Sequence, residues 1–284
     1  MRGGRIAAHA ALFLVPASIV CAVLAHSAAA LALAATEPGP TVSRPIERGP
    51  ATEKQVAFAV NVVWGTEYVR PIADAFRRDG SRATFFLGGE WAQAHPREAR
   101  FLRDLDMEIA SHGDRHRHVG HLSLEENLVE IDRAGAAIEA ASGVRPRLYA
   151  PAYGEISPEV LRAAQLRHLP VILWTIDTID WRTSMDPGTI RERVLSRLEP
   201  GAIILMHPTD RTLQALPGLL ADVKARGYRT VTVSRLLGLP AASDSDRKGV
   251  RAGPGTHAAQ AGAVFGRAEE GVAAAPRVSA AGAP

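Results

Sequence analysis

The chain has 284 residues, of which 46% are hydrophobic and 22% are charged, and its formal net charge is +3. This balance suits one globular domain with extensions, and it excludes the basic blocks with interleaved aromatic residues that bind nucleic acid. The single cysteine, Cys21, lies in the N-terminal apolar run, so the folded part has no disulfide, no thiolate metal site and no cysteine nucleophile.

Residues 1–36 have the pattern of an export segment. Met1–Arg5 is short and basic, and Ile6–Thr36 is rich in Ala, Leu and Val and contains no Asp, Glu, Lys or Arg. Small residues late in this run could be cut by a signal peptidase, whereas an uncut run is long enough to cross a bilayer. We therefore expect an exported protein at an extracytoplasmic or cell-surface location. Contact with the membrane is expected only through this signal peptide or anchor.

Residues 37–53 contain four prolines and no hydrophobic periodicity, which predicts a linker. From residue 54 the pattern alternates between short apolar runs and helical periodicity up to residue 239. The strands are predicted at 55–63, 83–87, 107–111, 148–150, 171–176, 202–206 and 230–233. Helices are predicted at 68–78, at 91–105 with a break at Pro96, from the capping box Ser123–Glu126 to 142, and after 157, 186 and 207.

About seven strand–helix units with apolar strands indicate an α/β fold whose parallel strands close, or nearly close, into a barrel. An open doubly wound sheet is the alternative, although no Gly-rich phosphate loop follows any strand. Residues 240–284 are rich in Ala, Gly and Pro and hold few large apolar side chains, so we expect them to be disordered. The protein is expected to be a monomer.

Polar and aromatic side chains collect where the predicted strands end, which is where a parallel barrel gathers its functional groups. Two histidines, His112 and His116, follow the third strand at a spacing that lets both contact one metal ion. Two ligands alone do not hold a structural zinc, and His118 and His121 are read as polar loop residues. The other strand ends carry Asn61, Pro151 with Tyr153, Asp177 with Asp180 and Trp181, and Leu205 with His207.

In this order, these motifs resemble the polysaccharide deacetylases of the NodB homology family over about Lys54–Leu239. The resemblance implies a (β/α)7-type distorted TIM-like barrel that removes N-acetyl groups from a cell-wall glycan such as peptidoglycan or chitin. It implies a divalent metal, usually zinc, held by His112 and His116. It also implies that His207 is the general acid, that Asp177 orients His207, and that the Tyr153 backbone amide holds the oxyanion. It further implies that Pro151, Trp181 and Leu205 contact the substrate. Trp181 and Leu205 would line the acetyl pocket.

The first family motif is altered in this chain. The family places a catalytic-base Asp and a metal-ligand Asp where this sequence has Asn61 and Val62, and an Arg where it has Ala150. An amide cannot accept a proton at useful pH, and valine cannot coordinate a metal. A divergent active hydrolase is one interpretation, with Glu67 or Asp114 as a possible third ligand. The alternative is a catalytically impaired, glycan-binding pseudoenzyme with a possible spore association.

Overall fold

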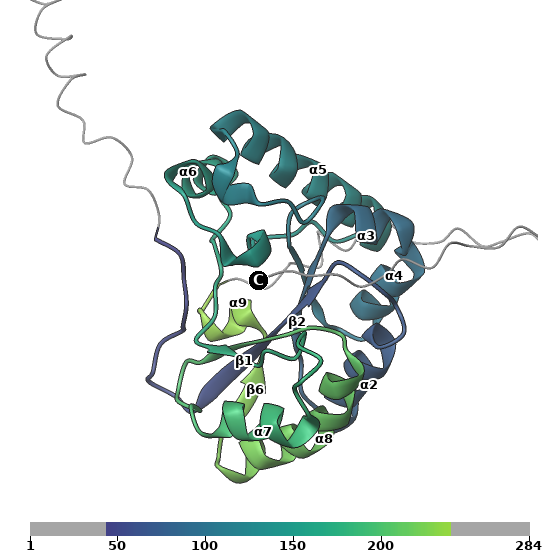
Figure 1. Cartoon of the computed structure of the whole chain (residues 1–284), viewed down its shortest axis with the longest axis vertical. Helices are drawn as coiled ribbons and strands as arrows, with labels where there is room; N and C mark the ends of the chain where they lie inside the picture. Colours follow the sequence, from purple (N-terminus) through teal and green to yellow (C-terminus); the bar gives the residue numbers. More distant parts are fainter. Residues whose placement is uncertain (1–43, 240–284) are drawn as a thin grey trace, which may run out of the picture. The chain divides into compact units, whose positions relative to one another are not determined.

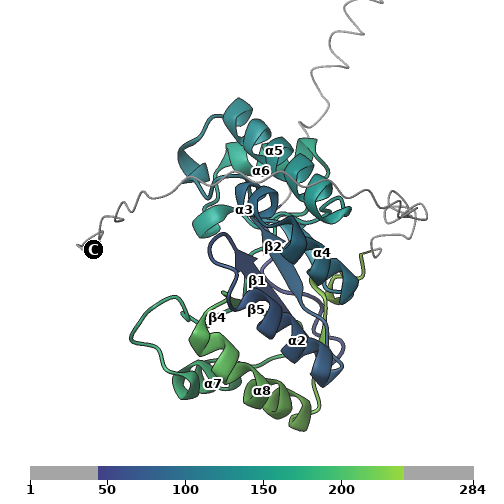
Figure 2. The same cartoon turned by 90° about the vertical axis from the view of Figure 1, so that its right-hand side faces the viewer.

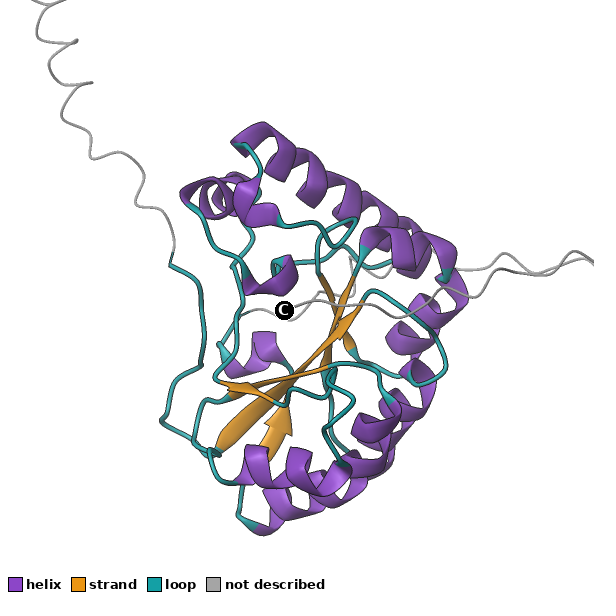
Figure 3. Cartoon of the chain, in the orientation of Figure 1, coloured by secondary structure: helices purple, strands orange, loops and turns teal. Residues whose placement is uncertain are grey.

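The computed structural model describes residues 44–239, and the predicted export segment and C-terminal tail lie outside these residues. Strands and helices alternate along the chain, and the helices surround the strands (Figures 1 and 3). The strands are β1 (Gln55–Val62), β2 (Thr84–Leu87), β3 (Glu108–Ser111), β4 (Ile176–Asp177), β5 (Ile203–Met206) and β6 (Arg229–Val231). The helices are α2 (Val69–Asp79), α3 (Gly89–Ala94), α4 (Pro96–Asp104), α5 (Leu124–Ser142), α6 (Pro158–Leu166), α7 (Pro187–Leu195), α8 (Asp210–Ala225) and α9 (Val233–Leu236), with short 3₁₀ turns at Val119–His121 and Ala152–Gly154.

Every strand pair in the sheet is parallel, in the order β3-β2-β1-β5-β4, and β6 pairs with the start of β1. Isolated parallel bridges continue from β3 through Tyr149 to Val171. A few residues later Ile176 pairs with Ile204 of β5. The strands and bridges therefore follow a ring, which the sheet leaves open between Val171 and Ile176. The α/β, barrel-like fold class predicted from the sequence is therefore confirmed, with an irregular stretch between Val171 and Ile176.

The two faces of β1 belong to different apolar clusters. Phe58, Val60 and Val62 pack in an outer cluster between the strands and the helices. Ala57 and Ala59 belong to an inner cluster inside the ring, together with side chains of the other strands and of α9. Small residues on the inner face leave room inside the narrow ring, and large ones on the outer face fill the space under the helices. Figure 2 shows α7 beside α8 and α5 beside α6 around this core.

Local signals in the sequence placed most helix ends correctly. Ser123 and Glu126 form both hydrogen bonds of the predicted capping box, and Gly143 ends α5 in the left-handed conformation. Gly80 ends α2 in the same way. The predicted helix at 91–105 is two helices, because Pro96 cannot continue α3 and instead begins α4.

Three strand predictions were wrong in extent. Residues 148–150 form only bridges, and residues 173–175 leave the strand pattern because the segment changes partners between Val171 and Ile176. The last strand stops at Val231, since Thr232 caps α9. Residues 46–49 of the predicted linker pair with neighbouring segments of the sheet, with Ile46 bridging Ile172 and packing on the inner cluster. No helix within residues 44–239 is long and apolar enough to cross a membrane.

Candidate active site

Several of the predicted site residues lie at the ends of strands or directly after them. His112 directly follows β3, His207 directly follows β5, and Asn61 is the penultimate residue of β1. Burial is the main cause that lowers the pKa of both His112 and His116, and the proximity of His207 lowers both further. Three of the non-glycine residues with positive φ lie at these strand ends: His116, Tyr153 and Ile179. Strained backbone of this kind clusters at functional sites.

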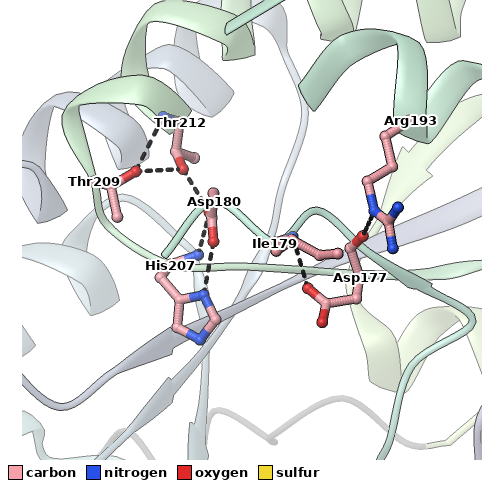
Figure 4. A network of polar contacts seen from close by, with 7 residues as sticks. All are labelled: Asp177, Ile179, Asp180, Arg193, His207, Thr209 and Thr212. Atoms are coloured by element: carbon pink, nitrogen blue, oxygen red, sulfur yellow. Dashed lines mark hydrogen bonds and ion pairs between the residues drawn. The ribbon is translucent and has the colours of Figure 1, made fainter. Parts of the chain in front are cut away.

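His207 is held by a buried carboxylate, that of Asp180. The His207 Nδ1 lies 2.8 Å from Asp180 Oδ1, and its backbone N–H donates to Asp180 Oδ2 at 2.7 Å. The hydroxyl of Thr212, on α8, donates to the same Oδ2 at 2.5 Å. Asp180 is fully buried, and Figure 4 shows the carboxylate between His207 and Thr212. An Nδ1–H that donates to this carboxylate leaves Nε2 of His207 for proton transfer.

The prediction that Asp177 orients His207 is wrong. The carboxylate of Asp177 accepts a hydrogen bond from the Ile179 backbone N–H at 2.8 Å. The backbone carbonyl of Asp177 accepts a second one from Arg193 Nε at 2.5 Å. Ile179 has φ 55°, and this left-handed turn directs Asp180 instead toward the histidine. Figure 4 shows Asp177 and Arg193 on the far side of the turn from His207. Sequence spacing could not distinguish the two carboxylates, which lie within one short motif.

His112 and His116 form the predicted pair, with ring centroids 5.2 Å apart. His112 is 2% exposed, and its Nδ1 lies 2.8 Å from the carbonyl oxygen of Ala150. A neutral His112 therefore donates from Nδ1 and keeps Nε2 as an acceptor. Burial lowers the pKa of His112 to about 3, and burial also lowers the pKa of His116. Both rings are thus biased toward the neutral form that binds metals or accepts hydrogen bonds.

The depressed pKa of His112 predicts a pH-dependent stability. Unfolding returns this imidazole to a pKa near 6.5, so the unfolded state binds one more proton than the folded state between about pH 3 and 6.5. The free energy of unfolding should therefore fall as the pH decreases through this window, by up to about 1.4 kcal/mol per pH unit from this group. Urea unfolding at several pH values checks this prediction. In His112→Asn, the slope of the unfolding free energy against pH should be smaller by the contribution of one proton. An unchanged slope would contradict the assignment.

The described residues do not supply a third metal ligand beside the histidine pair. No group of three His, Cys, Asp or Glu side chains within residues 44–239 is arranged to hold a metal ion. Val62 is completely buried in the outer apolar cluster. Glu67 accepts the Thr66 backbone N–H, and the Asp114 carboxylate lies 3.7 Å from Arg115. Two imidazoles do not fit the three-ligand set of a catalytic zinc site.

Asn61 faces the interior of the ring, on the same side of β1 as Ala57 and Ala59. It is 4% exposed, and its Oδ1 is buried without a hydrogen-bond partner. Ala150, where the family has an arginine, is also buried and uses its carbonyl for His112. The site therefore keeps an unpaired acceptor at the position that holds the base in the resembled family.

An aromatic stack that the sequence did not predict lies beside His116. Tyr153 is 53% exposed and stacks on His118, with ring centroids 4.2 Å apart and planes 10° apart. Glu155 fixes this stack, since its carboxylate lies 2.7 Å from His118 Nδ1 and accepts the Gly120 N–H at 3.0 Å. The hydrogen bond from His118 is the main reason that the pKa of Glu155 is lowered. His118 thus supports Tyr153 and is more than a polar loop residue.

The three residues predicted to contact substrate differ in exposure. Trp181 is 50% exposed, and the Arg182 guanidinium lies over its ring. Leu205 is 4% exposed and pairs with Ala59, and by alternation with Ile203 it faces the ring interior. Pro151 is buried in the turn that leads to Tyr153. Their roles toward a substrate stay predictions.

The chain is similar to known proteins in both sequence and fold. A family model described as polysaccharide deacetylase matches residues 48–171. A solved CE4 family pseudoenzyme from Bacillus anthracis is 35% identical with a TM-score of 0.67, and the match covers 68% of this chain and 69% of that one. A mutant of that pseudoenzyme, described as having restored enzymatic activity, is 34% identical with the same TM-score, over 68% of this chain and 71% of that one.

Two further relatives come from the genus Bacillus. The uncharacterized protein YlxY of Bacillus subtilis is 34% identical over 193 residues, which are 68% of this chain and 60% of that protein. A peptidoglycan-N-acetylglucosamine deacetylase of Bacillus cereus is 27% identical over 190 residues, covering 65% of this chain and 69% of that enzyme. The chain thus spans less than two thirds of the length of YlxY.

Proposed function

Because the chain belongs to the polysaccharide deacetylase family, we propose that it binds an N-acetylated cell-wall glycan, of the peptidoglycan or chitin type, and hydrolyses its acetamide groups only slowly. This proposal rests on one observation: the site keeps the hydrogen bonds of its candidate general acid but lacks a general base. The His207–Asp180–Thr212 chain is complete, whereas the base position is an amide, Asn61. The protein would work as an exported monomer, consistent with relatives named for peptidoglycan, a polymer outside the cytoplasmic membrane.

In this proposal His207 donates the proton that the leaving amine needs, from the Nε2 that Asp180 leaves available. Asp180 keeps the imidazole in that tautomer and stabilises its charged form, as the carboxylate does in other acid–base pairs. The left-handed Tyr153 presents its backbone amide to the oxyanion. Trp181 and Leu205 line the acetyl pocket, and Pro151 shapes the turn beneath the sugar.

Hydrolysis is slow in this proposal because no described residue takes the proton from the attacking water. General-base assistance is typically worth about 10²–10⁴-fold. The family resemblance implies a divalent metal, but the described ligands do not fit a three-ligand site. No proposed step uses the metal, and acetate release is therefore measured both with and without added metal.

A second candidate is a glycan-binding pseudoenzyme without hydrolytic activity. The similarity to the Bacillus anthracis pseudoenzyme favours it, as do the unusual residues Asn61, Val62 and Ala150.

Acetate release from N-acetylglucosamine oligomers, with and without zinc, cobalt or nickel, tests the proposed function. We expect slow release that His207→Ala abolishes, with oligomer binding measured separately by calorimetry. Oligomer binding without any release under any metal would leave the second candidate. Absence of both binding and release would overturn both candidates.

A further inference from the structure

The segment that follows β1 carries an aromatic side chain in a firmly anchored loop. The carbonyl of Gly65 accepts the Trp91 Nε1–H at 2.7 Å, and Trp91 is itself 5% exposed on α3. The next backbone N–H, that of Thr66, donates to Glu67 Oε2 at 3.0 Å. Gly65 has φ 61°, so the sharp bend suits a glycine. These contacts fix the backbone on the C-terminal side of Trp64.

Trp64 is placed directly against the candidate general acid. Its indole stacks on the His207 imidazole, with centroids 5.4 Å apart and planes 18° apart. The side chain is nevertheless 44% exposed. An indole ring that is held on one face and reaches water with nearly half of its surface offers a flat, pre-ordered apolar platform. The apolar C–H face of a pyranose ring is suited to such a platform.

Asn61, three residues earlier, supplies a polar group that lacks a partner. Its side chain is 96% buried and faces the ring interior, where its Oδ1 accepts no hydrogen bond from any described residue. Buried acceptors are normally paired, and an unpaired one calls for an explanation such as a water or a ligand. Three residues of extended chain cover at most about 10 Å, so the backbones of Asn61 and Trp64 lie within about that distance of each other.

We propose that Trp64 and Asn61 form a binding element for one N-acetylhexosamine residue. The pyranose ring packs on the exposed face of Trp64, and the acetamide N–H donates to Asn61 Oδ1. This inference rests on the proposed function and names the contacts that select an acetylated sugar. The position that holds a base in the resembled family is here a recognition group, which explains a neutral amide in a site that keeps the His207–Asp180–Thr212 hydrogen bonds.

Calorimetric titration with two tetramers, of N-acetylglucosamine and of glucosamine, tests the element on the full chain. Trp64→Ala should weaken binding of both tetramers about tenfold or more, and Trp64→Phe should keep most of the affinity because a flat ring remains. Asn61→Leu should weaken binding of the acetylated tetramer about tenfold, the effect of one lost hydrogen bond. Its effect on the glucosamine tetramer should be small. Leu166→Ala, an exposed apolar residue on α6, is the matched control and should change neither affinity.

The outcomes separate this inference from the proposed function. If the wild type binds the acetylated tetramer and neither Trp64→Ala nor Asn61→Leu weakens it, the binding element is overturned while the proposed function stands. If the wild type binds no tetramer, both are overturned. Thermal unfolding of each variant guards against a folding defect, and Asn61→Leu should fold well because it removes an unpaired buried acceptor. An equal loss in Trp64→Phe and Trp64→Ala would show that loop packing, and not ring stacking, governs affinity.

Discussion

Replacing Asp180 with alanine is expected to lower the free energy of unfolding by about 3–5 kcal/mol, because three donors in the protein interior lose their common acceptor. The carboxylate is fully buried and accepts hydrogen bonds from the His207 backbone, the His207 ring and the Thr212 hydroxyl. Alanine would leave these three donors without an acceptor in the protein interior, and each unpaired group carries a desolvation cost. Urea unfolding at pH 7, monitored by circular dichroism, measures the change.

Asp177 provides the matched control for this experiment. It is a carboxylate three residues away on the same turn, but it accepts only the Ile179 backbone N–H through its side chain. Asp177→Ala should cost about 0.5–1.5 kcal/mol, the usual net value of one hydrogen bond. Comparable losses in the two variants would contradict the assignment of Asp180 as the partner of His207.

Asn61→Asp is expected to raise acetate release from N-acetylglucosamine oligomers by about 10²-fold, the lower end of general-base assistance. The substitution is nearly isosteric and places a carboxylate on the inner face of β1, where the Oδ1 of Asn61 already lies unpaired. No arginine stands at Ala150 to neutralise it, so burial should raise the pKa of the new carboxyl group. A base acts only when ionised, so the gain should increase with pH through that raised pKa.

Val62→Asp, at the next residue, is the control for Asn61→Asp. Val62 lies in the outer apolar cluster, so a carboxylate there is buried among side chains that cannot pair with it. It should destabilise the protein and leave acetate release at the wild-type rate. Equal gains from the two variants, or a gain from Val62→Asp that depends on added zinc, would show that both positions reach the site.

Asp177 and Asp180 could not be told apart from the sequence. The motif placed both carboxylates at the end of the same strand, and the structure confirms that this segment meets the segment containing His207. Which of the two contacts the histidine depends on the left-handed turn at Ile179. A β-branched residue gives no signal for that conformation, which only the surrounding packing imposes.

A similar limit applies to β1. Alternation of polar and apolar residues normally tells which side chains face which side of a strand, but a strand buried on both faces is apolar throughout. The sequence therefore could not show that Val62 packs against the helices while Asn61 faces the ring interior. The sequence likewise could not predict the loop that places Trp64 against His207. That loop is anchored by a hydrogen bond from Trp91, which is distant in the sequence.

The sequence by itself determined the features that depend on local rules. Capping residues and glycines located helix ends, apolar runs located most of the strands, and the order of strand-end motifs indicated the family and the region of the site. The tertiary structure alone decided the pairing of Asp180 with His207, the opposite directions of Asn61 and Val62, and the platform at Trp64. These features depend on contacts between segments far apart in the chain, and their geometry follows from packing that no local pattern encodes.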